Sequence, residues 1–283
     1  MRVAFFHSDK PREHLLADAF LEGVKRHGDP IAMVNTAEEP TLDYEVACMV
    51  GVKSRELFQK HWRAGIHTVY LDKGYSRHKK PGPVSGWEFW RMAIDSHQPT
   101  EKYRNDCPDD RMKECGWEFK PWRKKGHKVI IAGSSEKYHA FYGLNEPTEY
   151  ATRLIHKIKK RAPQFEIVYR PKPSWAGAVE ITGAHYSIFP ETISDALKGG
   201  HVMITHGSNA CFEAATLGIP ALILGNAASR PISSTSFDDL ESPYLATDLE
   251  RKQLFSYLAY CQYSLVECSK GQAWAWIRPQ IYE

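Results

Sequence analysis

Short apolar runs alternate with amphipathic stretches through the first quarter of the chain. Val3–His7, Ile31–Asn35 and Val46–Val50 have the length and much of the β-branched or aromatic content of buried strands. The stretch Glu13–Arg26 instead carries apolar residues at helical spacing, and Gly28 follows it as a stop signal. Strands that alternate with helices in this way predict a parallel sheet with helices on its faces.

The same alternation continues to residue 71 and then breaks. A helix is expected over 54–64, followed by a strand over 68–71. Residues 72–120 are rich in Trp, His, Pro and Gly, and a single helix is expected there, over 87–95. The irregular segment therefore separates the first alternating block from whatever follows.

A second alternating block begins near residue 128. Its expected strands are 128–132, 166–169, 201–205 and 220–224, and its expected helices are 148–160, 193–198 and 209–217. A last long helix is expected over 248–269. The pattern predicts an α/β protein of two Rossmann-like domains facing a central cleft: residues 1–120 and 121–250, joined by a basic linker at 120–126, with residues 251–283 packing back toward the first domain.

Composition excludes several classes of protein. With 42% hydrophobic and 12% aromatic residues, the chain can bury enough apolar surface to fold, so intrinsic disorder is disfavoured. No apolar run approaches the roughly 18 residues of a membrane helix, so no membrane span is expected. The six cysteines form no Cys-x-x-Cys pair, which favours reduced thiols in a cytoplasmic protein and disfavours zinc.

The formal net charge is only +3, but the basic residues are unevenly distributed, and two basic runs contain no acidic residue. One spans residues 73–80 and the other spans 120–128. Such runs are either solvated surfaces or contacts for an anionic partner such as DNA. We expect both runs at the mouth of the cleft between the two domains.

Chemistry is expected at the carboxyl ends of the strands, where open parallel sheets bind their ligands. His7 and Asp9 end the first strand, and Asp72 ends the last regular strand of the first block. Asp72 is the carboxylate best placed to act as a general base. In the competing interpretation a nearby cation pairs with Asp72 and another carboxylate is the base: the cation is Arg77 or Lys73, and the base is Asp9, Asp95 or Glu88.

An aromatic cluster follows in the same half of the chain. Trp87, Trp90 and Arg91 stand at helical positions i, i+3 and i+4. Interleaved aromatic and cationic side chains can stack on and clamp a sugar or a base. The alternative is an ordinary core helix, which the same spacing fits equally well.

The strongest motif is Thr205–Pro220, with the sequence THGSNACFEAATLGIP, which follows a strand and opens a helix. The amides of Gly207, Ser208 and Asn209 fall at the helix N-terminus, where a phosphate is favoured. Glu213, one turn further on, suits a ribose diol rather than a phosphate. The alternative is a plain strand-to-helix turn with a capped helix and an exposed glutamate.

Ser208, Glu213 and Gly218-Ile219-Pro220 resemble the donor-site motif of glycosyltransferases with the two-domain GT-B fold. The likeness is greatest to the capsule-polysaccharide transferases that use CMP-Kdo. Those enzymes carry Arg-x-His-Pro or Lys-x-His-Pro before this helix, whereas this chain has Arg170-Pro171-Lys172-Pro173. Lys172 thus stands where those enzymes have a histidine. The lysine offers positive charge for a phosphate, but because of this difference the resemblance does not identify the donor.

A second likeness lies in the first half, where Tyr70–Arg77 is similar to the Glu-x-Gly-Tyr-x-Arg segment of the same capsule enzymes. The chain also resembles compact viral glycosyltransferases that modify hydroxymethylated pyrimidines in DNA. The small size, the two basic runs and the aromatic cluster favour that second group.

Together these likenesses imply a glycosyltransferase that takes a nucleotide sugar as co-substrate and needs no other cofactor. An inverting, metal-independent reaction is expected because no Asp-x-Asp motif is present; Asp109 and Asp110 are adjacent rather than spaced. The preferred acceptor is a hydroxymethylated base in double-stranded phage DNA, such as 5-hydroxymethylcytosine, and the alternative is a capsule or cell-surface glycan. A sugar-nucleotide epimerase and a non-catalytic nucleotide-sugar binder are the remaining hypotheses.

The candidate residues fall into three groups, with none assigned to a metal. Asp72 and Asp9 are assigned to catalysis. Gly133, Ser134, Ser135, Arg170, Lys172, Glu191, His206, Gly207, Ser208, Asn209 and Glu213 are assigned to the donor. His7, Lys73, Tyr75, Arg77, Trp87, Trp90 and Arg91 are assigned to the acceptor.

Overall fold

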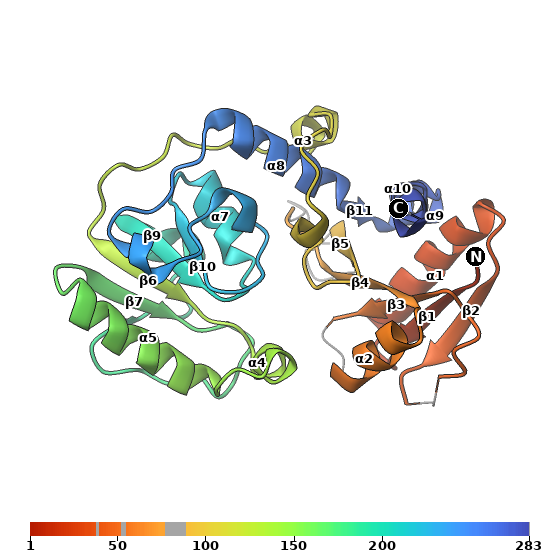
Figure 1. Ribbon diagram of the computed structural model, residues 1–283, viewed down its shortest axis with the longest axis horizontal. Helices are drawn as coiled ribbons and strands as arrows, with labels where there is room; N and C mark the ends of the chain where they lie inside the picture. Colours follow the sequence, from red (N-terminus) through yellow and green to blue (C-terminus); the bar gives the residue numbers. More distant parts are fainter. Residues whose placement is uncertain (38–39, 52–54, 77–88, 283) are drawn as a thin grey trace. The chain divides into compact units, whose positions relative to one another are not determined.

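The structure, a computed structural model, describes residues 1–37, 40–51, 55–76 and 89–282. The chain divides into two compact units: unit 1 is Met1–Lys102 with Tyr257–Glu283, and unit 2 is Tyr103–Ser256. Each unit contains a sheet with helices packed against it (Figure 1). No helix in the described part of the chain combines the length and apolar character needed to cross a bilayer.

Unit 1 is built on a six-stranded sheet in the order β11-β5-β4-β3-β1-β2. Its strands are β1 (Val3–His7), β2 (Ile31–Asn35), β3 (Val46–Val50), β4 (His67–Lys73), β5 (Phe89–Ile94) and β11 (Gln262–Ser264). The first four are parallel, whereas β5 runs antiparallel to β4 and β11 runs antiparallel to β5. The parallel strands are those that the apolar pattern predicts, because strands in the middle of such a sheet are covered on both faces.

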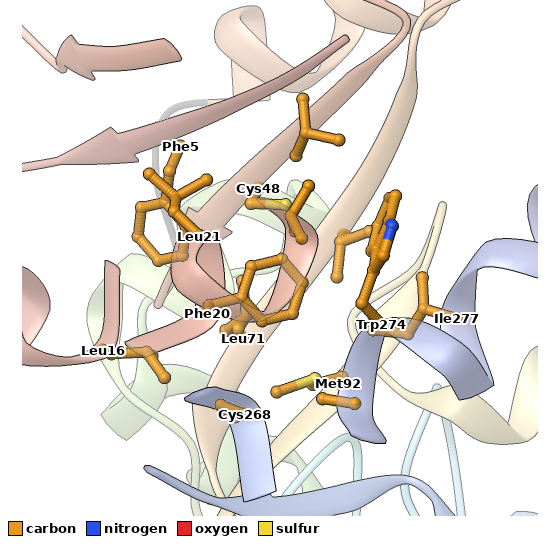
Figure 2. Close-up of a cluster of buried hydrophobic side chains, with 14 of the residues drawn as sticks. Phe5, Leu16, Phe20, Leu21, Cys48, Leu71, Met92, Cys268, Trp274 and Ile277 are labelled. Carbon is orange, nitrogen blue, oxygen red and sulfur yellow. The ribbon is translucent and has the colours of Figure 1, made fainter. Parts of the chain in front are cut away.

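Helices cover both faces of the unit 1 sheet. They are α1 (Pro11–Arg26), α2 (Arg55–Arg63), α9 (Leu265–Ser269) and α10 (Gln272–Tyr282), with a 3-10 turn η1 (Pro99–Lys102). Phe20 of α1 meets Trp274 of α10 edge-on, with ring centroids 5.9 Å apart, in the buried cluster of Figure 2. On the opposite face Phe58 of α2 packs against Tyr70 of β4, with ring centroids 6.3 Å apart.

The predicted helix over 87–95 is wrong, because residues 89–94 form strand β5. Residues 87 and 88 lie outside the described residues. Side chains alternate along a strand, so Trp90 and Arg91 point to opposite faces of the sheet. Trp90 enters the core with α1 and α10, while Arg91 turns toward Tyr70. Pairing with β4 on one side and β11 on the other fixes this segment as a strand.

The predicted helix over 248–269 is interrupted. Helix α8 (Asp248–Tyr260) ends before β11, and α9 begins after it. Gln262 of β11 is fully buried, and its side-chain oxygen accepts a hydrogen bond from the backbone N–H of Tyr75 at 2.7 Å. Ser264 then starts α9 through a reciprocal capping box with Glu267. The predicted helix is therefore interrupted for two reasons. The buried Gln262 side chain binds the loop after β4, and Ser264 starts a new helix two residues later.

Unit 2 is built on a five-stranded parallel sheet in the order β10-β9-β6-β7-β8. Its strands are β6 (Lys128–Ala132), β7 (Glu166–Arg170), β8 (His185–Tyr186), β9 (Gly200–Thr205) and β10 (Ala221–Ile223). Its helices are α3 (Asp110–Glu114), α4 (Glu136–Tyr142), α5 (Pro147–Arg161), α6 (Ile193–Ala196), α7 (Ala210–Thr216) and most of α8, with 3-10 turns η2 (Arg230–Ile232) and η3 (Phe237–Leu240). The sequence pattern does not predict α4.

The boundary between the units differs from the expected linker at 120–126. Residues 103–120 belong to unit 2, where the Lys120 N–H donates to the Thr216 carbonyl at 2.9 Å. Trp117 packs edge-on against Phe212, with ring centroids 4.7 Å apart. These contacts make the segment part of the second unit, and the chain returns to unit 1 after Ser256.

Arg251 of α8 is a fully buried cation in unit 2. One guanidinium nitrogen donates to the carbonyls of Lys120 at 2.9 Å and Ala215 at 2.7 Å. Its guanidinium carbon lies 4.1 Å from the ring centroids of both Phe119 and Trp122. Burial disfavours the charge and lowers the pKa of Arg251. The side chain ties the segment before β6 to the end of α7.

Candidate active site

The donor-side candidates in unit 2 follow its parallel strands. Gly133–Ser135 follow β6, Arg170 ends β7, and His206–Asn209 follow β9. Because β6, β7 and β9 are adjacent and parallel, these three loops lie at one edge of the sheet. Ser134 is buried there, and the Ser135 hydroxyl accepts the Tyr138 N–H, capping α4.

His206 occupies a small pocket at this edge. The pocket is lined by residues that include Gly133, Ser134, His139, Tyr150, Thr205 and His206. The imidazole Nδ1 lies 3.2 Å from the Tyr138 hydroxyl, and the ring packs edge-on against Tyr150 with centroids 6.2 Å apart. Helix α4 supplies Tyr138 and His139, so the pocket depends on the helix that the sequence does not predict.

Two glycines make room for this cluster. A Cβ at Gly207 would collide with the Tyr138 hydroxyl, and one at Gly225 would collide with the imidazole of His206. In both cases the colliding atoms belong to a side chain. A larger residue at Gly207 would therefore displace Tyr138, and one at Gly225 would displace His206. Close approach is therefore the physical reason for glycine at both sites.

Burial keeps both histidines of the pocket neutral near pH 7. It lowers the pKa of His206 to about 4, with a smaller contribution from His139. Burial also lowers the pKa of His139, although its hydrogen bond to the Asn145 carbonyl opposes the shift. Neutral imidazoles both donate and accept hydrogen bonds, so the pocket offers polar contacts without fixed charge.

The free energy of unfolding is expected to decrease as pH falls from about 6.5 to about 4. An unfolded imidazole titrates near pH 6.5, whereas the pKa values of folded His206 and of His97 in unit 1 are lowered to about 4. Between these values the unfolded chain binds more protons, so stability falls with a slope of up to about 1.4 kcal/mol per pH unit for each of the two imidazoles. Denaturant titrations at several pH values measure this slope.

A His206→Gln variant should lose part of that pH dependence, while His156→Gln, at an exposed position of α5, should retain it. Equal slopes for all three proteins would contradict the assignment of a neutral, buried His206.

The loop after β9 is held by its own hydroxyl groups. The Ser208 N–H donates to the Thr205 side chain at 3.0 Å, and the Ser208 hydroxyl accepts the Ala210 N–H at 3.3 Å. Asn209 occupies the N-cap position of α7 but makes no capping hydrogen bond with its side chain. Glu213 lies half-buried in the first turn of α7. Ser208, rather than the N-cap residue Asn209, therefore supplies the side-chain hydrogen bond at the start of α7.

The other donor-side candidates, Arg170, Lys172 and Glu191, are not among the residues that line the pocket around His206. Arg170 is half-buried and donates to the Ser187 hydroxyl at 2.8 Å. Lys172 is exposed in the following turn. Glu191 precedes α6, and its carboxylate lies 3.1 Å from the His185 imidazole. Only Arg170 directly ends a sheet strand.

In unit 1, Asp72 lies near the carboxyl end of β4. Its Oδ2 accepts the Tyr70 hydroxyl at 3.1 Å and faces Arg91 Nη2 at 3.3 Å, while Oδ1 accepts the Lys73 N–H at 2.8 Å. The cation beside Asp72 is therefore Arg91, a residue that the sequence assigned to the acceptor. Arg77, the alternative partner, lies outside the described residues, as do Trp87 and Glu88.

Asp95 is far along the sheet from Asp72, because β5 runs antiparallel and ends at the start of β4. Its carboxylate accepts the Thr68 N–H at 2.8 Å and lies 2.9 Å from His67 Nδ1. It adopts a left-handed backbone conformation with φ 56°, which aspartate tolerates better than most residues. These contacts hold the Asp95 carboxylate at the end of the sheet away from Asp72.

A buried carboxylate that the sequence analysis missed lies at the end of β1. Glu13 is 2% exposed and accepts both the N–H and the hydroxyl of Ser8 at 2.9 Å. Asp9 beside it is exposed, and the rings of His7 and His14 are 4.4 Å apart. The detectable signal is a serine before, and a glutamate inside, the first turn of a helix that begins with proline.

The remaining acceptor candidates serve packing. Trp90 is 3% exposed in the core, which leaves no free ring face for stacking on a ligand. Tyr75 is buried and donates from its hydroxyl to the Gln98 side chain at 3.2 Å. Arg91 is 4% exposed and therefore cannot reach a bulky acceptor directly. Lys73 ends β4, with its side chain half-buried.

The second basic run lies away from the donor-side loops. Residues 120–127 precede β6, and the Arg123 N–H donates to the Gly218 carbonyl at 2.6 Å, just before β10. The run therefore lies at the amino edge of the unit 2 sheet, opposite the edge that carries His206 and Gly133. The placement of this run at the mouth of the cleft between the two domains stays a prediction. Most of the first run, residues 77–80, lies outside the described residues.

Within the described residues, no group of three or more His, Cys, Asp or Glu side chains has an arrangement that could hold a metal ion. The free thiols of Cys48, Cys211, Cys261 and Cys268 are buried. None of these thiols forms part of the two clusters around His206 and Asp72.

Helix-covered sheets of mainly parallel strands, one in each of two units, are the elements of the two-domain, Rossmann-like fold called GT-B. The chain has this fold, as its likeness to solved structures shows. The KpsC β-Kdo 2,7 transferase of Thermosulfurimonas dismutans matches with a TM-score of 0.60 and 12% identity, over 99% of this chain and 100% of that one. The KpsC β-Kdo 2,4 transferase of the same organism matches with a TM-score of 0.57 and 15% identity, over 93% and 92%. No family model and no curated protein matches the sequence.

Proposed function

We propose that the protein is a glycosyltransferase that moves a sugar from a nucleotide sugar to a hydroxyl group of a saccharide. The observation that carries this proposal is the full-length likeness to two Kdo transferases. Likeness at 12% and 15% identity concerns the fold, so the function rests additionally on the side chains at the strand ends.

Unit 2 is proposed to bind the donor. The N–H groups of Gly207 and Asn209 are proposed to face the phosphate, while the Ser208 N–H is held by Thr205. Arg170 and Lys172 balance the charge of the phosphate, and Glu213 accepts hydrogen bonds from the ribose. The pocket around His206 contributes neutral hydrogen-bonding groups beside them. Gly133–Ser135 and Glu191 complete the proposed donor contacts.

Unit 1 is proposed to supply the base. Asp72 takes the proton of the acceptor hydroxyl as its oxygen attacks the anomeric carbon. The new carbon–oxygen bond forms while the bond to the donor phosphate breaks, and the electron pair leaves on the phosphate. This single displacement inverts the anomeric centre and needs no metal, in keeping with the expectation from sequence.

The acceptor hypothesis now favours a saccharide over DNA. The names of both similar structures refer to Kdo transfer. The exposed cations Arg123, Lys124 and Lys125, which favour DNA, lie at the sheet edge opposite the donor-side loops. Hydroxymethylated double-stranded DNA is therefore the second candidate acceptor.

A panel of CMP-, UDP-, GDP- and ADP-sugars, CMP-Kdo included, tests the proposal. We expect slow hydrolysis of one donor by the purified protein and faster nucleotide release with a saccharide acceptor. Release that rises only with hydroxymethylated DNA, and falls steeply with salt, would favour the second candidate. Conversion of the donor to its epimer without nucleotide release would indicate an epimerase. Binding without turnover would indicate a non-catalytic protein.

Glu213→Ala is expected to weaken binding of the donor about tenfold, because a good hydrogen bond to an uncharged group contributes roughly 1 kcal/mol and one to a charged group more. Isothermal titration calorimetry measures the change. Glu166→Ala is the matched control, since Glu166 is exposed at the start of β7, at the opposite edge of the sheet. Equal affinities for Glu213→Ala and the unsubstituted protein would remove Glu213 from the donor site.

A further inference from the structure

We infer that Arg91 is a positioning residue that orients and keeps ionised the proposed base, Asp72. This inference rests on the proposed function and assigns a role to a residue that touches neither donor nor acceptor. Arg91 and Asp72 are directly opposite in the antiparallel pairing of β4 with β5. Cross-strand partners on one face of a sheet bring their side chains into contact.

The guanidinium group is held in a fixed position. Arg91 is 4% exposed, and Nη1 donates to the His97 carbonyl. Its guanidinium carbon lies 5.3 Å from the centroid of the Tyr70 ring. Nη2, the other end of the planar fork, faces Asp72 Oδ2 at 3.3 Å. A planar cation with one end bound to the backbone can present its other end in only one direction.

The carboxylate receives a complementary set of donors. Oδ2 is shared by Arg91 and the Tyr70 hydroxyl, at 3.3 and 3.1 Å, and Oδ1 accepts the Lys73 N–H at 2.8 Å. The Asp72 side chain nevertheless remains 38% exposed. Interior groups thus orient the carboxylate while part of it remains accessible to an acceptor hydroxyl.

Arg91 is the principal positive charge among the described groups packed around Asp72 from β5 and the following turn. His97 lies against Tyr70 with ring centroids 4.6 Å apart, and burial, reinforced by Arg91, lowers the pKa of His97 to about 4. It is therefore neutral near pH 7. Tyr70 and Tyr75 are neutral donors, and Lys73 lies on the same strand as Asp72. Removing the Arg91 cation should consequently favour the protonated form of Asp72, which cannot act as a base.

Arg91→Lys and Arg91→Met separate the two parts of the inference. Lysine retains a charge but cannot bridge the His97 carbonyl and Asp72 with a planar fork. We expect kcat to fall about 10- to 100-fold in Arg91→Lys, as expected for a misplaced catalytic group, with little change in donor affinity. In Arg91→Met the acidic limb of the kcat/KM profile should also move to higher pH. Arg63→Lys, at an exposed position of α2, is the control and should leave both unchanged.

The outcomes distinguish this inference from the function on which it rests. An unsubstituted protein without transferase activity contradicts the proposed function. A protein whose activity depends on Asp72, but whose kcat and pH profile are unaffected by Arg91→Lys, contradicts the positioning role alone. A third measurement avoids substitution: the ¹⁵N resonances of the Arg91 side chain should titrate at the pH of the acidic kinetic limb. Resonances that do not change across that limb overturn the inference even if both variants fail to fold.

Discussion

Asp72→Asn is expected to lower kcat for sugar transfer by about 10²- to 10⁴-fold, the range typical of losing a general base. Asparagine keeps the shape of the side chain, and its single amide oxygen can still accept from the Lys73 N–H, but the amide does not take up the acceptor proton. Donor affinity should be retained, because Asp72 is in unit 1 and the proposed donor residues are in unit 2. Steady-state kinetics combined with calorimetry of donor binding measures both quantities.

Two further variants complete this experiment. Asp18→Asn alters an exposed carboxylate of α1 and should leave transfer unchanged. Asp9→Asn tests the second candidate base at the end of β1. Full activity of Asp72→Asn together with loss of activity in Asp9→Asn would move the base to Asp9.

Arg251→Met is expected to reduce the free energy of unfolding of unit 2 by about 3 kcal/mol, because it leaves the buried Ala215 carbonyl and the partly buried Lys120 carbonyl without their donor. Methionine can occupy much of the space between Phe119 and Trp122, where the guanidinium carbon lies 4.1 Å from each ring centroid. Replacement of a buried cation by an apolar residue is sometimes neutral. Here the carbonyls of Lys120 and Ala215 remain behind, which is why we expect a loss.

This loss can be measured by hydrogen exchange at increasing denaturant in segments 117–123 and 210–217. These segments report the free energy of unfolding of unit 2 rather than an average over the whole chain. Arg153→Met is the matched control, since Arg153 is exposed on α5 and pairs only with Glu149 in an i,i+4 ion pair. Such a pair contributes about 0.3–0.5 kcal/mol. A loss below 1 kcal/mol for Arg251→Met would show that the two carbonyls find other partners.

Several of the parallel strands could be predicted from the sequence because they are buried along most of their length. All five residues of Val46–Val50 are buried, so a continuous apolar run marks the strand. The strand order then predicts which loops lie together. Residues that follow adjacent parallel strands, such as Gly133 and His206, necessarily lie at the same edge of the sheet. The donor-side loops could therefore be listed before their geometry was known.

The antiparallel edge of unit 1 could not be predicted in the same way. The segment 89–94 fits both a helix and a strand on spacing alone, and its partner β11 lies near the far end of the chain. The pairing with β4 and with β11 makes the segment a strand, and Trp90 and Arg91 therefore face opposite sides. The role of Arg91 beside Asp72 was hidden for the same reason.

Two further features of the candidate site, helix α4 and the buried Glu13, could not be predicted from the sequence. Helix α4 has seven residues, too few for a clear periodic signal, yet it supplies Tyr138 and His139 to the pocket around His206. Glu13 was overlooked because a carboxylate in a first helical turn is normally a surface residue that interacts with the helix dipole. Glu13 is instead buried in contact with Ser8, five residues earlier in the chain.

The late position of β11 in the chain has a consequence for biosynthesis. Unit 2 is one continuous stretch, Tyr103–Ser256, whereas unit 1 needs residues from both ends of the chain. A ribosome therefore synthesises all of unit 2 before it adds Gln262, whose side chain holds the loop at Tyr75 and Ser76. Until then the edge of β5 that pairs with β11 has no strand partner and is open to non-native association. The unit whose first strand is made earliest is thus the last of the two to have all its strands.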